Sequence, residues 1–236
     1  MAKGKLFLIP NTIGDTEIEK VIPAYNLELM NTIFCYIVEN VRTARRFLSK
    51  CKIANKIDDL QFFILNEHTN PIEYKQFILP ALKGMHLGII SEAGCPAIAD
   101  PGAEIVKLAH LNEIEVVPLV GPTSIILALM ASGFNGQRFS FNGYLPVKPD
   151  ERATRIRKDE QRSRQEQQTQ IYIETPYRNN PLIESFLANL HPETRLCIAV
   201  NLSSSLEFIK TRTINQWKGK IPDLNKQPAI FLFHAG

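Results

Sequence analysis

Residues 91–102 of the chain, SEAGCPAIADPG, bring together two glycines, two prolines and two acids. An apolar, strand-like segment at residues 87–90 precedes this stretch, and a helix-like segment follows it. Proline restricts the path of the backbone, and glycine leaves main-chain amides open to a ligand. Because open α/β sheets bind small ligands at the carboxyl ends of their strands, this stretch predicts a ligand-binding loop of an α/β protein.

Around this loop, short β-type runs alternate with helical patterns from the start of the chain to about residue 118. Apolar residues recur at helical spacing near Ala44 and Phe47, and again near Ile105 and Ala109. This alternation is typical of a mainly parallel sheet with crossover helices. The predicted strands are residues 5–9, 33–38, 61–65, 86–90 and 115–118.

The segment VGPTS, residues 120–124, interrupts this pattern with a glycine and a proline, and Thr123 or Ser124 can cap the apolar helix predicted at residues 125–131. We therefore predict two domains, residues 1–119 and 120–236. The second half favours a more antiparallel or mixed sheet, because residues 138–144 alternate polar and aromatic side chains and several strand-like segments follow. Its predicted strands are residues 138–144, 170–174, 195–201, 206–213 and 229–234, and its predicted helices are residues 149–168 and 181–190.

The composition is that of a globular protein with a sizeable core, since 44% of the 236 residues are apolar. The net charge of +3 provides no long-range field that requires a nucleic-acid partner, although it is compatible with a local basic patch. No apolar run approaches the ~20 residues of a membrane span, so we expect a cytoplasmic protein that is not bound to a membrane. The four widely spaced cysteines are expected to be reduced thiols, and the five histidines lack metal-ligand spacing.

Glu39 and Arg42 stand where a predicted strand ends and a helix begins. A carboxylate in this position can hydrogen-bond a ligand, or it can be held by Arg42 in a structural ion pair. The sequence leaves both alternatives open.

Lys148 lies in a rigid turn with two prolines and opens the charged segment 148–164. This segment is either a solvated helix of mixed charge or a surface that follows the phosphates of a nucleic acid. Glu174 and Arg178 flank another proline turn, in which Thr175 and Pro176 suit the capped start of a helix. No nucleophile elbow is present, which disfavours a hydrolase.

Taken together, these segments resemble the tetrapyrrole methylase superfamily of S-adenosylmethionine-dependent methyltransferases, and within it most closely the ribosomal RNA small subunit methyltransferase I family. The resemblance extends over nearly the whole chain, and residues 91–102 are its longest and most specific part. The motifs that carry it are NTIGD (residues 11–15), ENVR (39–42), SEAGCPAIADPG (91–102), VGPTS (120–124), SG (132–133), FNGYLPVK (141–148) and IETPYR (173–178).

The resemblance implies two α/β domains with S-adenosylmethionine in the cleft between them, and a homodimer. It also implies that loops from both domains contact the cofactor. The residues in these contacts would be Ile13, Ser91, Glu92, Ala93, Gly94, Gly121, Pro122, Thr123, Ser124, Leu202, Pro228, Ala229 and Ile230.

On the substrate side, the resemblance implies roles for Glu39, Arg42, Lys148 and Arg178. Methyl transfer to a ribose hydroxyl needs a proton acceptor, so Glu39 or a polarising Lys148 is the candidate catalytic group, and Arg42 and Arg178 would bind the substrate. The implied function is 2'-O-methylation of a ribose in small-subunit ribosomal RNA. The alternatives are methylation of a tetrapyrrole or another small molecule, and a donor-binding or RNA-binding protein without turnover.

Several positions depart from the family pattern. Asn40 and Val41 replace the middle of the Glu-Asp-Thr-Arg motif, Glu92 replaces an aspartate, and Asn201 begins a stretch that is acidic in the family. The sequence also ends at Gly236, without the C-terminal extension of the longer ribosomal members. A cofactor site tolerates such changes better than a substrate site, because donor affinity can rest on main-chain groups and pocket shape.

Overall fold

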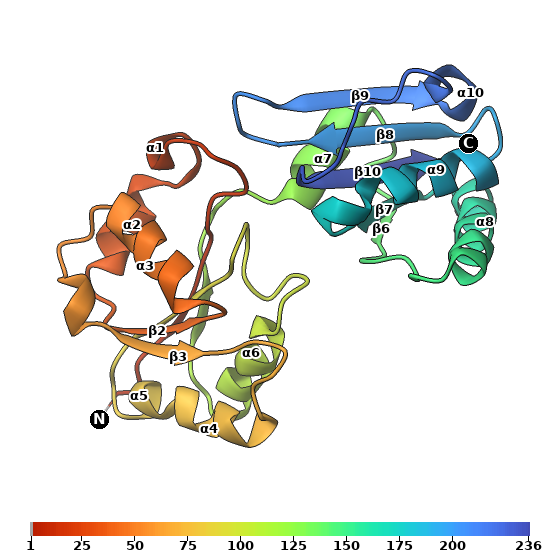
Figure 1. Ribbon diagram of the computed structural model, residues 1–236. Helices are drawn as coiled ribbons and strands as arrows, with labels where there is room; N and C mark the ends of the chain where they lie inside the picture. Colours follow the sequence, from red (N-terminus) through yellow and green to blue (C-terminus); the bar gives the residue numbers. More distant parts are fainter. Residues whose placement is uncertain (1) are drawn as a thin grey trace. The chain divides into compact units, whose positions relative to one another are not determined.

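The computed structural model describes residues 2–236, and the chain divides into two compact units, Met1–Thr123 and Ser124–Gly236 (Figure 1). Both units contain a sheet covered by helices, which confirms the predicted α/β class with a parallel and a mixed sheet. Among residues 2–236, no helix has both the length and the apolar character needed to cross a membrane. The domain boundary predicted after residue 119 stays a prediction, since compactness does not show which segments fold independently.

The sheet of the first unit has five parallel strands in the order β3-β2-β4-β1-β5. The central strands β2 and β4 are buried at every position, as expected for parallel strands covered on both faces. All five strands lie within the segments predicted from the sequence. They are β1 Leu6–Ile9, β2 Cys35–Val38, β3 Gln61–Ile64, β4 Leu87–Ile90 and β5 Val116–Pro118.

Two apolar clusters flank this sheet because successive side chains of a strand point to opposite faces. Phe7 and Ile9 belong to one cluster, together with Phe47 of α3, whereas Leu6 belongs to the other, together with Ile105 of α6. The helical elements of this unit are α1 Ile18–Val21, α2 Ala24–Met30, α3 Val41–Lys50, η1 Ile57–Asp59, η2 Pro71–Glu73, α4 Tyr74–Phe77, α5 Leu79–Leu82 and α6 Gly102–Leu111.

The sheet of the second unit has the order β6-β7-β10-β8-β9. Only the pair of β6 and β7 is parallel, which makes the sheet mixed, as predicted. Its strands are β6 Phe139–Phe141, β7 Thr169–Ile173, β8 Arg195–Val200, β9 Phe208–Thr213 and β10 Ala229–His234. Its helical elements are α7 Ser124–Ser132, α8 Pro149–Glu166, η3 Pro176–Arg178, α9 Asn179–Asn189 and α10 Ile214–Trp217.

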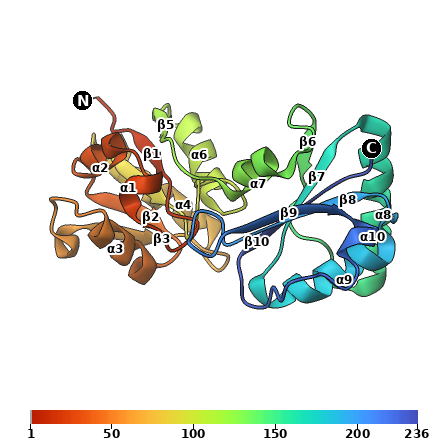
Figure 2. The same ribbon diagram turned by 90° about the horizontal axis from the view of Figure 1, so that it is seen from above.

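Figure 2 shows α7 on one side of this second sheet and α9 and α10 on the other. The core lies on the side of α9 and α10, where Phe186 and Trp217 pack with Phe231 of β10. Trp217 is fully buried, and its Nε1 donates a hydrogen bond to the carbonyl of Leu196 at 2.9 Å. The core therefore fixes the strands whose ends carry the predicted site residues of this unit.

Candidate functional site

Loops that follow β1, β4 and β5 meet at the carboxyl edge of the first sheet. The amide of Asn11 donates to the carbonyl of Gly94 at 2.9 Å, and its Nδ2 donates to the carbonyls of Ser91 and Glu92 at 3.0 and 3.1 Å. The half-buried thiol of Cys95 donates to the carbonyl of Pro122 at 3.4 Å. Three segments that are distant in the sequence are thus joined by side-chain and main-chain donors that all bind main-chain carbonyls.

Two predicted cofactor-site glycines stand at the points where these loops touch. Gly94 has φ of 69°, and a Cβ atom there would lie 3.2 Å from Cγ2 of Ile13 and 3.4 Å from the carbonyl oxygen of Pro122. A Cβ atom on Gly121 would lie 2.2 Å from Cβ of Pro10. Gly121 has no room for a Cβ atom, and the positive φ of Gly94 favours glycine. The loops that carry predicted cofactor-site residues of the first unit therefore touch at these two glycines.

The second part of the 91–102 loop is held by Asp100. Its Oδ1 accepts hydrogen bonds from the amides of Ala97 at 2.9 Å and Gly102 at 2.8 Å. Ala97 and Ala99 have φ of 65° and 60°, a left-handed conformation that is unfavourable for residues with a Cβ atom. The other oxygen, Oδ2, is buried and has no hydrogen-bond partner within residues 2–236. A backbone strained in this way is typical of functional loops.

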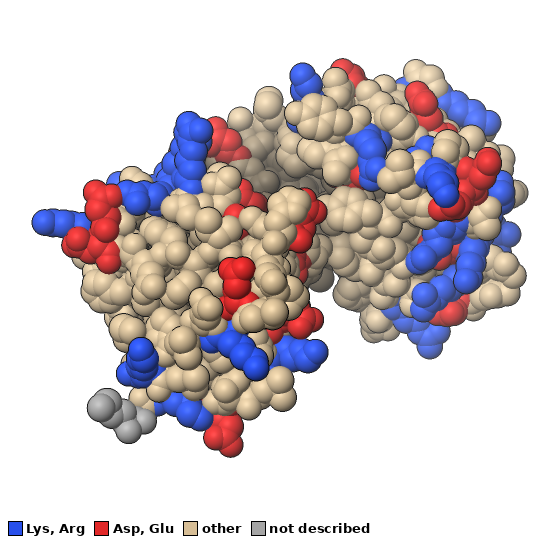
Figure 3. Space-filling model, turned by 60° about the horizontal axis from the view of Figure 1, so that its bottom comes forward, with Lys and Arg blue, Asp and Glu red and all other residues tan. Residues whose placement is uncertain are grey.

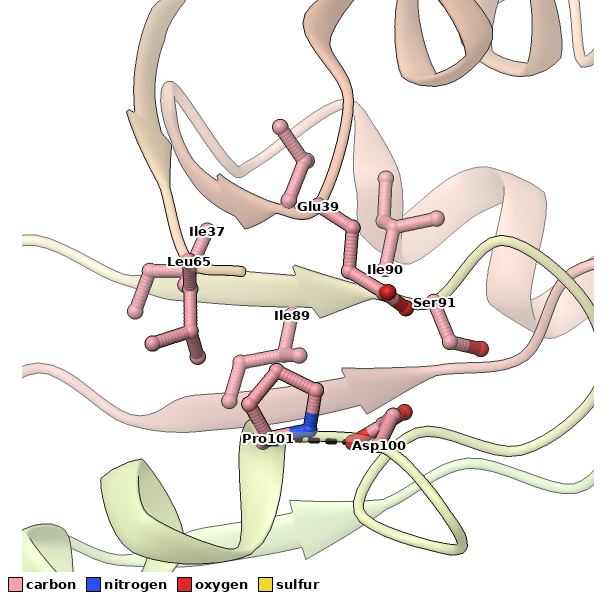
Figure 4. Close-up of a pocket in the computed structure, with 10 residues that line it drawn as sticks. Ile37, Glu39, Leu65, Ile89, Ile90, Ser91, Asp100 and Pro101 are labelled. Carbon is pink, nitrogen blue, oxygen red and sulfur yellow. Dashed lines mark hydrogen bonds between the residues drawn. The ribbon is translucent and has the colours of Figure 1, made fainter. Parts of the chain in front are cut away.

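Glu39 follows β2 and lines a small hollow together with Ser91 and Asp100. Figure 4 shows the Glu39 side chain pointing toward Ser91, with apolar side chains from β2 and β4 beside it. We call this space the acidic hollow. Its lining residues are Ile37, Val38, Glu39, Leu65, Ile89, Ile90, Ser91, Asp100, Pro101 and Gly102.

The surroundings of Glu39 favour its protonated form. Burial raises the pKa of Glu39, a backbone hydrogen bond from Glu92 lowers it, and the negative charges of Asp100 and Glu92 raise it. Burial also raises the pKa of Asp100, against the two amides that stabilise its charge. Arg42 is exposed and forms no ion pair with Glu39 or with any other acid of the described chain. The structural ion pair, one of the two alternatives for Glu39, is therefore wrong.

Two of the departures from the family pattern have clear local functions. Oδ1 of Asn40 accepts hydrogen bonds from the amides of Arg42 at 2.9 Å and Thr43 at 3.4 Å, which caps the N-terminus of α3. The hydroxyl of Thr43 donates to Oε1 of Glu92 at 2.5 Å. Asn40 thus provides the cap that an aspartate would provide, and Glu92 links the start of α3 to the 91–102 loop.

In the second unit, two segments predicted to contact the cofactor lie side by side. The amide of Asn201 donates to the carbonyl of Pro228 at 3.0 Å, where β8 ends and β10 begins. Asn201 has φ of 51°, a conformation that asparagine adopts readily, and its Nδ2 donates to Oε1 of Gln227 at 2.7 Å. Leu202 is buried beside this turn, and Ser124 begins α7.

The predicted substrate-side cations of the second unit differ in their surroundings. The Lys148 side chain is 79% exposed and forms an ion pair with Glu151 at 3.0 Å. The Arg178 guanidinium donates twice to Oε1 of Glu174, at 2.9 Å and 2.5 Å, and the Glu174 side chain is only 2% exposed. Thr175 occupies the cap position of η3, but its side chain makes no cap hydrogen bond. Its amide and its hydroxyl both donate to Oε1 of Glu174, at 2.7 and 3.3 Å.

Sequence reasoning did not select Asn11 and Asp100 as site residues. Asn11 donates a hydrogen bond to Ser91, which is 80 positions away in the sequence. No local sequence pattern reveals such a contact. Asp100 could have been selected from the sequence, since it is one of the two acids of the constrained 91–102 loop.

The chain was compared with family models, curated proteins and solved structures. No family model matches it. Among the curated proteins, it is 31% identical over 215 residues to ribosomal RNA small subunit methyltransferase I of Pseudomonas aeruginosa, covering 89% of this chain and 71% of that protein. It is 30% identical over 234 residues to the enzyme of the same name from Haemophilus influenzae, covering 97% and 78%.

Solved structures show the same fold at lower identity. The methyltransferase CobJ superposes with a TM-score of 0.64 and 14% identity, covering 98% of this chain and 94% of that one. The uroporphyrin-III-C-methyltransferase from Thermus thermophilus gives a TM-score of 0.57 and 15% identity, covering 99% and 95%.

The two units and their sheets have the fold of these two solved methyltransferases. At 30% and 31% identity over most of both chains, the chain belongs to the ribosomal RNA small subunit methyltransferase I family. The resemblance stated from the sequence is thereby confirmed.

Proposed function

We propose that this methyltransferase transfers a methyl group from S-adenosylmethionine to the 2'-hydroxyl oxygen of a ribose in small-subunit ribosomal RNA. The main support is its similarity to relatives named as methyltransferases of that RNA, over 89% and 97% of its length. The loop cluster of the first unit supports a bound small molecule, and the half-buried Glu39 supplies a group that can take up a proton.

The loop cluster suits a cationic cofactor. Its main-chain groups come from three loops that Gly94 and Gly121 allow to approach closely, and three acids stand beside them, Glu39, Glu92 and Asp100. The residues proposed to hold S-adenosylmethionine are Ile13, Ser91, Glu92, Ala93, Gly94, Gly121, Pro122 and Thr123 of the first unit, with Ser124, Leu202, Pro228, Ala229 and Ile230 of the second.

When bound, S-adenosylmethionine supplies a methyl group on a sulfonium sulfur, which keeps the electron pair of the broken bond. The ribose oxygen forms the new bond to carbon, and its proton passes to the Glu39 carboxylate. Arg42 is exposed at the start of α3, where its free guanidinium can hold a phosphate beside Glu39. Correct placement of the hydroxyl accounts for much of the acceleration, up to ~7 to 11 kcal/mol in favourable cases.

The second unit supplies the proposed RNA-binding surface. Figure 3 shows Lys and Arg side chains gathered over α8, interspersed with acids. Arg155 and Lys158 line a shallow groove on α8 together with Asp150 and Glu151, and Lys148 immediately precedes this helix. Several cations at this spacing can neutralise RNA phosphates without sequence-specific contacts. Arg178 retains N–H groups beyond those bound to Glu174, and we propose that they contact the RNA backbone.

We also propose a homodimer that acts in the cytoplasm, where ribosomal RNA is found. Helix α7 consists almost entirely of apolar residues, yet Ile126 and Met130 are exposed by 40% and 74%. An all-apolar helix is normally buried, so a second copy of the chain is the proposed cover. Light scattering should report a dimer for the protein and a monomer for a Met130→Glu variant. A monomeric wild-type protein would refute the dimer.

The activity is tested with purified protein, labelled S-adenosylmethionine and small ribosomal subunits, together with maps of 2'-O-methylation in cells with and without the gene. Loss of one ribose mark on deletion, restored by the purified enzyme in vitro, would support the proposal. An unchanged map with turnover on a tetrapyrrole would favour the small-molecule alternative. Donor binding without transfer to any acceptor would favour a binding protein.

A further inference from the structure

The two carboxylate oxygens of Asp100 have different surroundings. Oδ1 holds the loop by accepting from the amides of Ala97 and Gly102, and it leaves no room for a side chain on Gly102, where a Cβ atom would lie 2.8 Å away. Oδ2 does not take part in this arrangement, because it is buried and unpartnered within the described chain. A neutral hydrogen-bond acceptor would suffice to hold the two amides. The negative charge of Asp100 therefore has no evident partner in the loop that it organises.

This charge lies in the same hollow as Glu39. Both residues line the acidic hollow, whose other walls are mostly apolar, including Ile37, Leu65 and Ile89 (Figure 4). Two like charges repel more strongly beside apolar walls than in water, because the effective dielectric constant is lower. No basic side chain lines the hollow to compensate them.

The other charged groups near Glu39 do not neutralise the repulsion between Glu39 and Asp100. Glu92 also carries a negative charge, although its Oε1 is occupied by the hydroxyl of Thr43. Arg42 on α3 is exposed and makes no ion pair with Glu39. The pKa of Glu39 is therefore raised first by burial and then by the charges of Asp100 and Glu92, against the backbone hydrogen bond from Glu92 that lowers it.

We propose that Asp100 is a positioning residue that acts through Glu39, its charge keeping the Glu39 carboxylate basic enough to accept the ribose proton. This inference rests on the proposed function of Glu39. In the transfer step the oxygen–carbon bond forms, the carbon–sulfur bond breaks with its electron pair left on sulfur, and the hydroxyl proton moves to Glu39. Asp100 exchanges no proton and touches no reacting atom.

The Asp100→Asn variant separates the charge from the loop geometry. Asparagine keeps an oxygen for the amides of Ala97 and Gly102 but removes the charge from the acidic hollow. Asp100→Ala removes both functions. Glu104→Gln is the matched control, because Glu104 is an exposed acid on α6 close to Asp100 in the sequence, and it does not line the hollow.

The first measurement does not depend on activity. The full-length protein, labelled with ¹³C at glutamate side-chain carboxyls, is titrated by NMR, and the Glu39 signal is identified by its loss in Glu39→Gln. We expect the pKa of Glu39 to fall in Asp100→Asn and to stay unchanged in Glu104→Gln. An unchanged Glu39 titration in Asp100→Asn, or loss of its folded structure by near-ultraviolet circular dichroism, would overturn the proposal.

The second measurement is the pH dependence of methyl transfer to small ribosomal subunits. In Asp100→Asn the acid limb of kcat should move to lower pH, and the plateau should fall because Glu39 has become a weaker base. A uniformly lower profile with no shift would indicate a purely structural role and overturn the proposal. If the pKa of Glu39 falls in the NMR titration while neither protein methylates any RNA, the coupling between the two acids stands and the proposed function fails.

Discussion

The loops of the first unit and the charged segments of the second unit hold their predicted site residues in different ways. In the first unit, the main-chain amide of Asn11 binds the carbonyl of Gly94 and its side-chain Nδ2 binds the carbonyl of Ser91, so every acceptor is a main-chain group. In the second, Lys148 is mostly exposed and Arg178 is bound to a buried acid of its own unit. A site built from main-chain groups keeps its geometry when side chains change, whereas a site built from long side chains depends on each of them. The departures at Asn40 and Glu92 fit this difference, because they leave the loop contacts intact.

The largest effect is expected where the loops of the first unit touch. In Gly121→Val the new side chain would overlap with Pro10, whose Cβ lies 2.2 Å from the position of the new Cβ. We expect a loss of about 1–3 kcal/mol in unfolding free energy from overpacking, and at least a ~10-fold loss in S-adenosylmethionine affinity, or ~1.4 kcal/mol. Urea unfolding and calorimetry measure the two effects.

The control for this variant is Gly136→Ala in the second unit, where a Cβ atom meets nothing within 4 Å. It should bind the donor as the wild type does. Normal donor binding by Gly121→Val would show that the junction of the loops is not part of the cofactor site. The proposal that the first unit holds the donor through its loop contacts would then be wrong.

The second prediction separates stability from donor binding in the second unit. Asp159 is buried and accepts hydrogen bonds from the hydroxyl of Tyr172 at 2.7 Å and from Nε of Arg155 at 2.6 Å. Asp159→Ala leaves the buried hydroxyl unpartnered, so we expect it to lower the unfolding free energy by about 1–3 kcal/mol. Donor affinity, measured by calorimetry below the unfolding transition, should not change.

Glu166→Ala provides the comparison, since it removes an exposed ion pair with Arg162 on the same helix. That change should lower stability by less than about 1 kcal/mol. Equal losses in the two variants would mean that Asp159 is not the buried anchor that its contacts indicate.

The sequence predicted the strands and most of the longer helices because these depend on local patterns. Alternation and apolar runs placed β1 to β5, and the proline turns placed the starts of α8 and η3. The predicted pairing of Thr175 and Pro176 at the start of η3 is confirmed, but the Thr175 side chain makes no cap hydrogen bond. Its hydroxyl instead donates to Oε1 of Glu174, a contact that no local pattern reveals.

The candidate site was predictable in its loops but not in its contacts. Residues 91–102 were identified by their glycines, prolines and acids. The link made by Asn11 depends on which strands are neighbours in the sheet, and β1 lies beside β4 although much of the first unit separates them in sequence. The unpartnered oxygen of Asp100 is likewise a result of how the loop folds back on itself.

A third, smaller effect is expected from the cap of α3. Asn40→Ala removes the acceptor for the amides of Arg42 and Thr43, which should lower the unfolding free energy by about 1 kcal/mol. Asn40→Asp keeps an acceptor and restores the family residue, so its stability should equal or exceed that of the wild type. If Asn40→Ala is as stable as the wild type in urea, this departure does not matter for the fold.

The smallest effect concerns a single cation of the proposed RNA surface. Lys158 is exposed on α8 beside Arg155. Because the second unit is proposed to bind RNA through exposed side chains, we expect each cation to make its own contribution to RNA affinity. Lys158→Gln should weaken ribosomal RNA binding at every sequence and reduce the slope of log affinity against log salt by about 1. Filter binding between low and moderate salt measures both. Lys56→Gln, at an exposed lysine of the first unit, should leave the slope unchanged. If the slope changes equally in both variants, RNA binding responds to the overall positive charge of the protein, and a specific contact by Lys158 on α8 is refuted.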